Sequence, residues 1–276
     1  MRLCAFARKK TYAKSLRKKI KIESFAPLRE KKPTLKIRLM KFITGNGIEV
    51  PAVTTQQMIE IDRIAMEETG PNLYQMMENA GRNLCMLTLE KLGNSWNTSH
   101  ILILAGTGGN GGGGMCAARH LANHGADVTV CVTDVSKLKE VPAFQLHILQ
   151  STSAKVITVE ELKNENPEII LDAIIGYSLT GEPAGNALKM IEWASGKSAF
   201  IISLDVPSGI NSTTGAGAIN HIKPNATLTL ALPKTGLLPE LSGELYVADI
   251  GIPARVFQKL NLSYTPPFGN RYYVKI

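Results

Sequence analysis

The stretch His100–Leu121, HILILAGTGGNGGGGMCAARHL, decides the fold that the sequence predicts. Its apolar run Ile101–Leu104 is typical of a buried strand, and apolar residues at helical spacing follow the glycines over 115–121. A glycine turn between a strand and a helix presents unpaired backbone N–H groups, and the helix dipole adds partial positive charge at that point. We therefore expect this turn to bind a phosphate.

The same turn matches the dinucleotide-binding pattern G-x-G-x-x-G at Gly106, Gly108 and Gly111. Asp134 ends the next apolar run, where a ribose-binding acid would lie. The match is weak because the stretch holds seven glycines, and a flexible surface turn is the alternative. A Walker-type loop is excluded, since no G-K-[ST] follows. Asn110 offers an amide for a cation or ligand, or it serves only to accommodate a left-handed backbone.

The charge of the chain is unevenly distributed. Of its 276 residues, 44% are hydrophobic and 20% charged, as in ordinary globular proteins, and the net charge is +8. Residues 1–42 hold 15 Lys or Arg against 2 acids, whereas the remainder holds 16 against 21. The body is therefore mildly acidic, which argues against nucleic acid as a partner. No apolar run is long enough to span a bilayer, so no membrane association is expected.

The basic segment 1–42 has three interpretations: a disordered extension, an organelle-targeting segment, or sequence translated upstream of Met40. We favour the disordered extension, followed by a single domain over 50–276. A cytoplasmic location is then expected, with a mitochondrial one as the alternative if the segment is a targeting signal.

Cysteine and histidine spacing gives no firm metal site. The four cysteines lie far apart in the sequence: Cys4, Cys85, Cys116 and Cys131. Three of them have apolar neighbours. This pattern predicts buried free thiols, and therefore a protein that resides in a reducing compartment. His120 and His124 form an H-x-x-x-H pair on the helix after the glycines, but no third ligand is evident. Zinc is therefore disfavoured.

Along the chain, helical and strand patterns alternate. Strands that alternate with helices, followed by a strand-rich C-terminal part, predict an α/β fold with a mainly parallel, doubly wound sheet between helix layers. The globular part is expected to begin near Val53. Helices are expected at 55–69, 72–92, 115–121, 142–150, 160–163 and 187–194, and strands at 101–104, 127–133, 155–159, 168–171, 199–204, 226–232 and 244–250.

Three predicted strands end in polar, glycine-containing turns: the glycine turn 105–114, Asp172 with the loop to Glu182, and Asp205–Gly209. Ligands of such sheets bind beyond the carboxyl ends of the strands, at the switch in winding order. One such Asp is often only a turn residue, but two beside a phosphate-type loop favour a site. Asn110, Asp172 and Ser208 offer hard oxygen donors, which suit a monovalent or hard divalent cation better than zinc.

Five motifs carry a resemblance to a known family: GNGGGGMCAARHL, LDAIIGYSLTGEP, SLDVPSGINSTTG, ALPKTGLL and GELYVADIGIP. They resemble, in order, the YjeF N-terminal domain, the NAD(P)H-hydrate epimerase family, over about Thr54 to Pro253. The resemblance implies a Rossmann-like three-layer α/β/α sandwich and a homodimer. It also implies an isomerase that interconverts the R and S hydrates of NADH and NADPH (NADHX and NADPHX), a metabolite-repair step, and a separate dehydratase in the pathway.

The resemblance also assigns residues. It implies one potassium ion per subunit, held by Asn110, Asp172 and Ser208. It places hydrate-binding positions at Gly109, Asn110, Gly111, Gly112, Gly113, Gly176, Tyr177, Ser178, Leu179, Thr180, Gly181, Glu182 and Asp205. We hypothesise that Asp205 is catalytic, giving a proton to the leaving oxygen and taking it back. Lys234 in PKTG binds phosphate, balances charge, or is simply solvated.

Two departures from the family pattern leave rival interpretations open. The family's loop reads N-N-G-G-D-G, and here Gly109 and Gly113 replace the first Asn and the Asp. A lost bond to a charged group is worth roughly 1.5–3 kcal/mol, which weakens binding roughly tenfold to a hundredfold. The alternatives are a non-catalytic nucleotide- or protein-binding domain of the RNA-decapping scaffold type and an NAD-dependent dehydrogenase.

Overall fold

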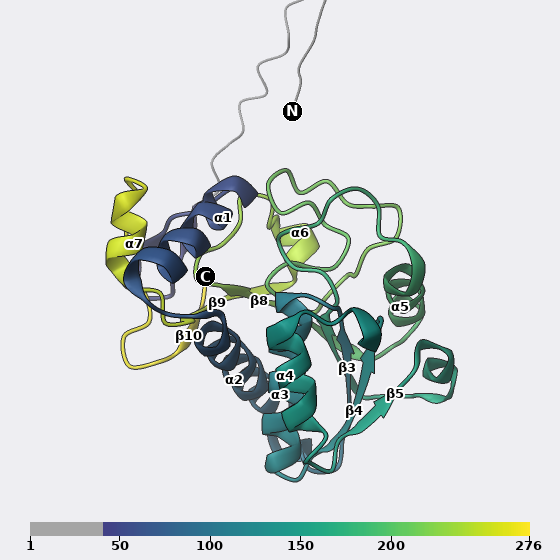
Figure 1. Cartoon of the computed structure of the whole chain (residues 1–276). Coiled ribbons are helices and arrows are strands. Elements are labelled where there is room, and N and C mark those ends of the chain that lie inside the picture. The colour runs from purple at the N-terminus through teal and green to yellow at the C-terminus, as the bar shows by residue number, and fades with distance from the viewer. Residues whose placement is uncertain (1–40) are drawn as a thin grey trace, which may run out of the picture. The chain divides into compact units, whose positions relative to one another are not determined.

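A computed structural model describes residues 41–276, and its centre is an eight-stranded sheet (Figure 1). The strand order is β10-β9-β8-β7-β6-β3-β4-β5, and all neighbours are parallel except β10 and β9. The predicted doubly wound, mainly parallel sheet is confirmed. Its strands are β3 (His100–Ala105), β4 (Asp127–Val132), β5 (Lys155–Ile157), β6 (Ile169–Ala173), β7 (Phe200–Leu204), β8 (Ala226–Leu230), β9 (Glu244–Ala248) and β10 (Tyr273–Lys275).

Strand β3 shows why the sheet needs helices on both faces. Ile101 and Ile103 point into a core shared with helices α2 (Leu73–Leu92), α3 (Gly109–Asn123) and α4 (Glu140–Leu149). Leu102 and Leu104 point the other way, into a core shared with α5 (Gly185–Ser195) and the 3₁₀ helix η4 (Val159–Asn164). Figure 1 shows α2, α3 and α4 together on one side and α5 apart from them. Alternation along a fully buried strand thus builds the predicted three layers.

A third core lies around β8, β9 and the end of the chain, and part of it was not predicted. Helix α1 (Thr55–Ile64) begins at the capping box of Thr54 and continues as a π-helical turn, Ala65–Thr69. It packs with elements whose short lengths leave no sequence period: β1 (Phe42–Ile43), β2 (Glu49–Val50), α6 (Pro239–Ser242) and α7 (Ala254–Lys259). Phe42 is buried in this core although it belongs to segment 1–42, for which we favoured a disordered extension, and Val50 is buried ahead of the start expected near Val53.

Three of the four cysteines and Asp134 lie in the described part of the chain. Cys85, Cys116 and Cys131 are free and buried, as predicted, whereas Cys4 and the predictions for residues 1–40 lie outside the described residues. Asp134 caps the short 3₁₀ helix η3 (Val135–Lys137) by accepting the Ser136 N–H, and it pairs with Lys137. Among residues 41–276, no helix is both long and apolar enough to cross a membrane.

The glycine turn is shorter than expected, because α3 already begins at Gly109. Four buried glycines therefore lie inside the first two turns of the helix, where each lets another part of the chain come close. A Cβ on Gly111 would lie 1.9 Å from the Gly106 carbonyl oxygen, and one on Gly114 would lie 2.5 Å from the Ala173 Cβ. The glycines that read as loop residues in the sequence are packing residues that seat α3 against β3 and β6.

This packing makes a testable prediction for Gly111→Ala. The added methyl would meet backbone that cannot rotate away, so we expect a loss of about 3 kcal/mol or more in the free energy of unfolding, the upper range for overpacking. Gly109→Ala is the matched control, since its Cβ would meet only Met77 Cε at 3.5 Å. Urea unfolding measures both variants, and equal stability of the two would contradict the packing role.

Candidate functional site

The candidate site lies where β3, β6 and β7 end side by side. Leu104 of β3 pairs with Asp172 of β6, which pairs in turn with Ser203 of β7. The Gly106 N–H donates to the Ala173 carbonyl at 3.0 Å, which ties the glycine turn to the loop after β6. The chain winds outward in opposite directions from β3 and β6, so the site occupies the switch point of the sheet.

Asp172 is a fully buried carboxylate held by neutral groups. It accepts hydrogen bonds from Ser208 Oγ at 2.5 Å, Ser203 Oγ at 2.7 Å, Ser208 N at 2.9 Å and Ile174 N at 3.3 Å. No basic side chain within residues 41–276 forms an ion pair with it. Burial raises the pKa of Asp172, and the four hydrogen bonds oppose that rise. The site therefore holds a carboxylate whose charge lacks a protein counter-ion.

Ser208 joins the loops after β6 and β7. Its hydroxyl donates to Asp172 and accepts the Ile175 N–H at 2.9 Å, while its own N–H also bonds to Asp172. The side chain is completely buried. Ser208 thus lies in direct contact with Asp172, its predicted partner as a cation ligand.

Asp205 adopts a left-handed backbone conformation, with φ of 68°, at the turn that follows β7. Its carboxylate Oδ2 accepts the Tyr177 N–H at 3.0 Å, and its Oδ1 forms an ion pair with Lys234. The Lys234 side chain is 0% exposed and also donates to the Leu230 carbonyl at 2.9 Å. Lys234 is therefore not a solvated lysine: it balances the charge of Asp205.

Gly176 brings Asn110 and Asp205 to one place. A Cβ on Gly176 would lie 3.1 Å from Asp205 Oδ2 and 3.3 Å from Asn110 Oδ1, so both side chains flank this glycine. The buried Asn110 Nδ2 finds no hydrogen-bond partner in residues 41–276. An unpartnered buried N–H donor is costly, which makes Asn110 a candidate to donate a hydrogen bond to an acceptor on a ligand.

The structure separates the predicted site residues into groups. Asp172 contacts Ser208, and Asn110 and Asp205 flank Gly176, with the Tyr177 N–H bonded to Asp205. The two sets of contacts are neighbours, because Ser208 accepts the N–H of Ile175, the residue before Gly176. The loop that leaves the site carries one half-buried residue, Leu179, and four exposed residues: Ser178, Thr180, Gly181 and Glu182. The remaining predicted positions lie in the first two turns of α3: Gly109, Gly111, Gly112 and Gly113.

Gly113 faces the protein interior. A Cβ there would lie 2.9 Å from Leu204 Cδ2 and 3.7 Å from Ala80 Cβ. A carboxylate at this position would enter apolar packing, so the structure gives no support to the interpretation of Gly113 as a lost ligand contact.

The sequence patterns did not single out Asp62, which anchors the site from α1. The Tyr177 hydroxyl donates to Asp62 Oδ2 at 2.6 Å, and Ser212 Oγ donates to the Tyr177 carbonyl at 2.8 Å. Burial raises the pKa of Asp62, and burial together with Asp62 raises that of Tyr177. A contact across 115 residues has no local sequence signal. Together with its N–H bond to Asp205, Tyr177 is held at three points.

A double-mutant cycle tests the Asp62–Tyr177 contact. Asp62→Ala and Tyr177→Phe each remove one partner of a charge-assisted hydrogen bond, so each should lower the free energy of unfolding by about 1.5–3 kcal/mol. The double variant should lose at least about 0.5 kcal/mol less than the sum of the two, since the second change removes nothing further from the bond. Urea unfolding of the three variants measures this coupling, and simple additivity would show that the contact contributes nothing.

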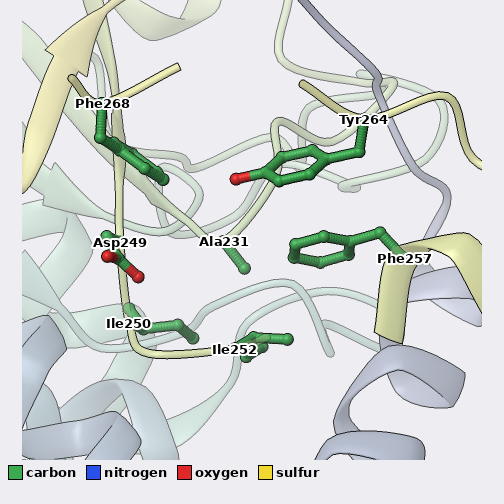
Figure 2. Close-up of a pocket in the computed structure, with 7 residues that line it drawn as sticks. All are labelled: Ala231, Asp249, Ile250, Ile252, Phe257, Tyr264 and Phe268. Atoms are coloured by element: carbon green, nitrogen blue, oxygen red, sulfur yellow. The ribbon is translucent and has the colours of Figure 1, made fainter. Parts of the chain in front are cut away.

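A small cavity elsewhere takes no part in this site. Its volume is about 10 Å³, which suffices for no more than one water. Figure 2 shows the aromatic rings of Phe257, Tyr264 and Phe268 around it, with Asp249 at one side. None of its lining residues is a predicted site residue.

Comparison with known proteins decides the family. A family model described as YjeF-related protein N-terminus matches residues 73–236. The chain belongs to this family. The resemblance that the five motifs carry is therefore confirmed.

YjeF-related relatives cover most of the chain. It is 49% identical over 238 residues to an NAD(P)H-hydrate epimerase of Dehalogenimonas lykanthroporepellens, which covers 86% of this chain and 97% of the relative. A Rhodopirellula baltica protein of the same name is 31% identical over 81% of this chain and 94% of its own length. The crystal structure of yeast ynu0 is similar with a TM-score of 0.74 and 25% identity, over 82% of this chain and 100% of that one.

Proposed function

We propose that this chain is an isomerase that interconverts the R and S epimers of NAD(P)H hydrate. The observation that carries the proposal is the convergence of Asp205, Asn110 and the buried Asp172 at the switch point, in a chain 49% identical to an NAD(P)H-hydrate epimerase. Homodimer formation and a separate dehydratase that consumes the hydrate are expectations from the family, whereas a cytoplasmic location is an expectation from the sequence.

The chemistry requires one proton to move at one oxygen. The hydrate carbon C6 carries a hydroxyl group and the ring nitrogen. As the C6–O bond breaks, the nitrogen lone pair forms a C=N bond, and the hydroxide accepts a proton and leaves as water. Addition of water to the opposite face of the planar carbon, with return of the proton, completes the inversion. A general acid–base group beside C6 therefore suffices.

The contacts of Asp205 support its assignment as that group. Its Oδ2 faces Gly176 and Asn110, while its Oδ1 contacts Lys234. A proton that shifts from Lys234 Nζ to the carboxylate would make Asp205 the donor without any change in the charge of the pair. Asn110 and the backbone N–H groups that open α3 would hold the nucleotide, because the first N–H groups of a helix lack helical partners.

The residues present fit a potassium ion. Asp172 is buried without a cationic partner in the described chain. Carboxylate, amide and hydroxyl oxygens of Asp172, Asn110 and Ser208 are hard donors suited to such an ion. When bound, potassium would supply positive charge beside Asp172.

The buried carboxyl group of Asp172 should make the stability of the protein depend on pH. Because the folded-state pKa of Asp172 is raised above 3.8, the folded state binds this proton more tightly than the unfolded chain does. Its contribution to stability is therefore present below pH 3.8 and is lost as pH rises through the folded-state pKa. Asp172→Asn should remove this loss. Asp62 also has a raised pKa and contributes to the pH dependence of stability in the same direction. Because Asp62 is present in both proteins, its contribution is removed when the wild type is compared with Asp172→Asn.

The matching ligand experiment uses potassium chloride against choline chloride at equal ionic strength. Above the folded-state pKa, potassium at a hundred times its Kd should stabilise the wild type by about 2.7 kcal/mol and leave Asp172→Asn unchanged. Thermal unfolding measures the difference. An equal response of both proteins would exclude Asp172 as a ligand.

The proposed activity is tested by incubating the pure protein with one hydrate epimer and separating the products by chromatography. Appearance of the other epimer supports the proposal. Formation of an oxidised nucleotide would indicate a dehydrogenase, and binding without conversion would indicate a non-catalytic domain.

A further inference from the structure

Helices α2 and α3 come unusually close at one point, and a group of side chains gathers there. A Cβ on Gly81 of α2 would lie 2.4 Å from the Cys116 Cβ of α3, so only glycine permits this approach. Glu78 lies one turn before Gly81, and His120 lies one turn after Cys116. The crossing thus brings three different metal-binding side chains together, and we name Glu78, Cys116 and His120 the α2–α3 cluster.

The donor atoms of the α2–α3 cluster already converge. One ligand atom from each residue lies within 4.8 Å of the other two. Cys116 Sγ is 3.3 Å from Glu78 Oε2, and His120 Nε2 is 2.8 Å from Glu78 Oε1. Ligands of a tetrahedral zinc ion stand roughly 3–4 Å apart, given metal–ligand distances of about 2.0–2.3 Å. Small side-chain movements would therefore suffice to form a site.

We propose that the α2–α3 cluster binds one zinc-like divalent transition-metal ion. Cys116 would bind through its thiolate, His120 through Nε2 and Glu78 through a carboxylate oxygen, with water as the fourth ligand. The S–H bond breaks, a metal–sulfur bond forms, and the proton leaves to solvent. Sulfur and nitrogen donors favour zinc, whereas the hard oxygen donors near Asp172 favour potassium.

The cluster is separate from the candidate catalytic site. Cys116 lies six residues after Asn110 along α3, which corresponds to roughly 9 Å at about 1.5 Å per residue. The Cys116 side chain is buried, whereas the side chains of Glu78 and His120 are 42% and 22% exposed. A metal ion can thus enter from the exposed side of the cluster.

Arg119 competes with the metal ion. Its guanidinium forms an ion pair with Glu78 Oε2 and lies 3.4 Å from Cys116 Sγ. It now supplies the positive charge that a metal ion would bring, so metal binding must weaken its pair with Glu78. Arg119→Gln should therefore bind the metal at least threefold more tightly, whereas a purely structural ion-pair network would gain no affinity for metal from this change.

The test uses the full chain, freed of metal by a chelator and titrated with Co²⁺ and then Zn²⁺. We expect 1:1 binding of Co²⁺ with a near-ultraviolet thiolate-to-cobalt absorption band, which Zn²⁺ abolishes by displacement. Cys116→Ser should remove the band, and His120→Ala should weaken binding at least tenfold. Cys131→Ser and His124→Ala are the matched controls, since these residues lie outside the cluster, and both should keep the band.

Glu78→Gln provides a second test if Cys116→Ser does not fold. Its side chain is partly exposed, so the change is tolerable, and it should weaken cobalt binding at least tenfold. Absence of the band in the wild type would overturn the proposal. So would a band that persists in Cys116→Ser or depends on Cys131.

Discussion

Asp205→Asn is expected to lower the rate of hydrate epimerisation by about 10²–10⁴-fold, the usual contribution of a general acid–base group. The amide cannot give or take the proton that the leaving oxygen needs. Asparagine is the substitution of choice because Asp205 has a φ of 68°, a left-handed conformation that Asn tolerates better than Ala does. The measurement is the initial rate of conversion of one epimer, at saturating substrate.

The structure adds a condition to this experiment. Asn at position 205 leaves the fully buried Lys234 without its counter-charge, so Asp205→Asn alone should also lose stability. The control is Asp205→Asn with Lys234→Met, which removes both charges. This double variant should be folded and still lack activity. Wild-type turnover in either variant would exclude Asp205 from the mechanism.

Lys234→Met alone should have the largest effect on stability. It leaves the buried Asp205 carboxylate unpaired, and breaking one side of a buried pair costs about 3–5 kcal/mol. Activity should fall as well, since Asp205 loses the side chain that is proposed to supply its proton. Urea unfolding measures the loss.

The double variant distinguishes a buried ion pair from two independent residues. Removing the second charge should restore most of the lost stability, because an apolar replacement of a buried pair is often nearly neutral. If Asp205→Asn with Lys234→Met is as unstable as the sum of the single variants, the two side chains do not act as a pair.

Much of the scaffold could be predicted because it rests on local patterns. The apolar run before the glycines and the β-branched strands encode local structure, and the strands predicted from them lie within a few residues of their expected places. The positions of Asp172 and Asp205 at strand ends follow from the same patterns, since parallel strands bring their carboxyl ends to one edge.

The remainder depends on contacts that have no sequence period. Glycines 111–114 looked like a loop because helix propensity disfavours glycine, yet tight packing against β3, β6 and α2 overrides that preference. A lysine is ordinarily solvated, so only its tertiary surroundings show that Lys234 is the counter-ion of Asp205. Asp62 reaches Tyr177 across 115 residues, and the hairpin at 42–50 is too short to show alternation.

The most direct test of the central claim starts from each pure epimer of NAD(P)H hydrate in separate reactions with the wild-type chain and potassium chloride. Chromatography should show both reactions reaching the same ratio of R to S, faster in proportion to the amount of protein and without formation of oxidised nucleotide. If neither epimer converts faster than it does in buffer alone, the switch-point site is not an epimerase.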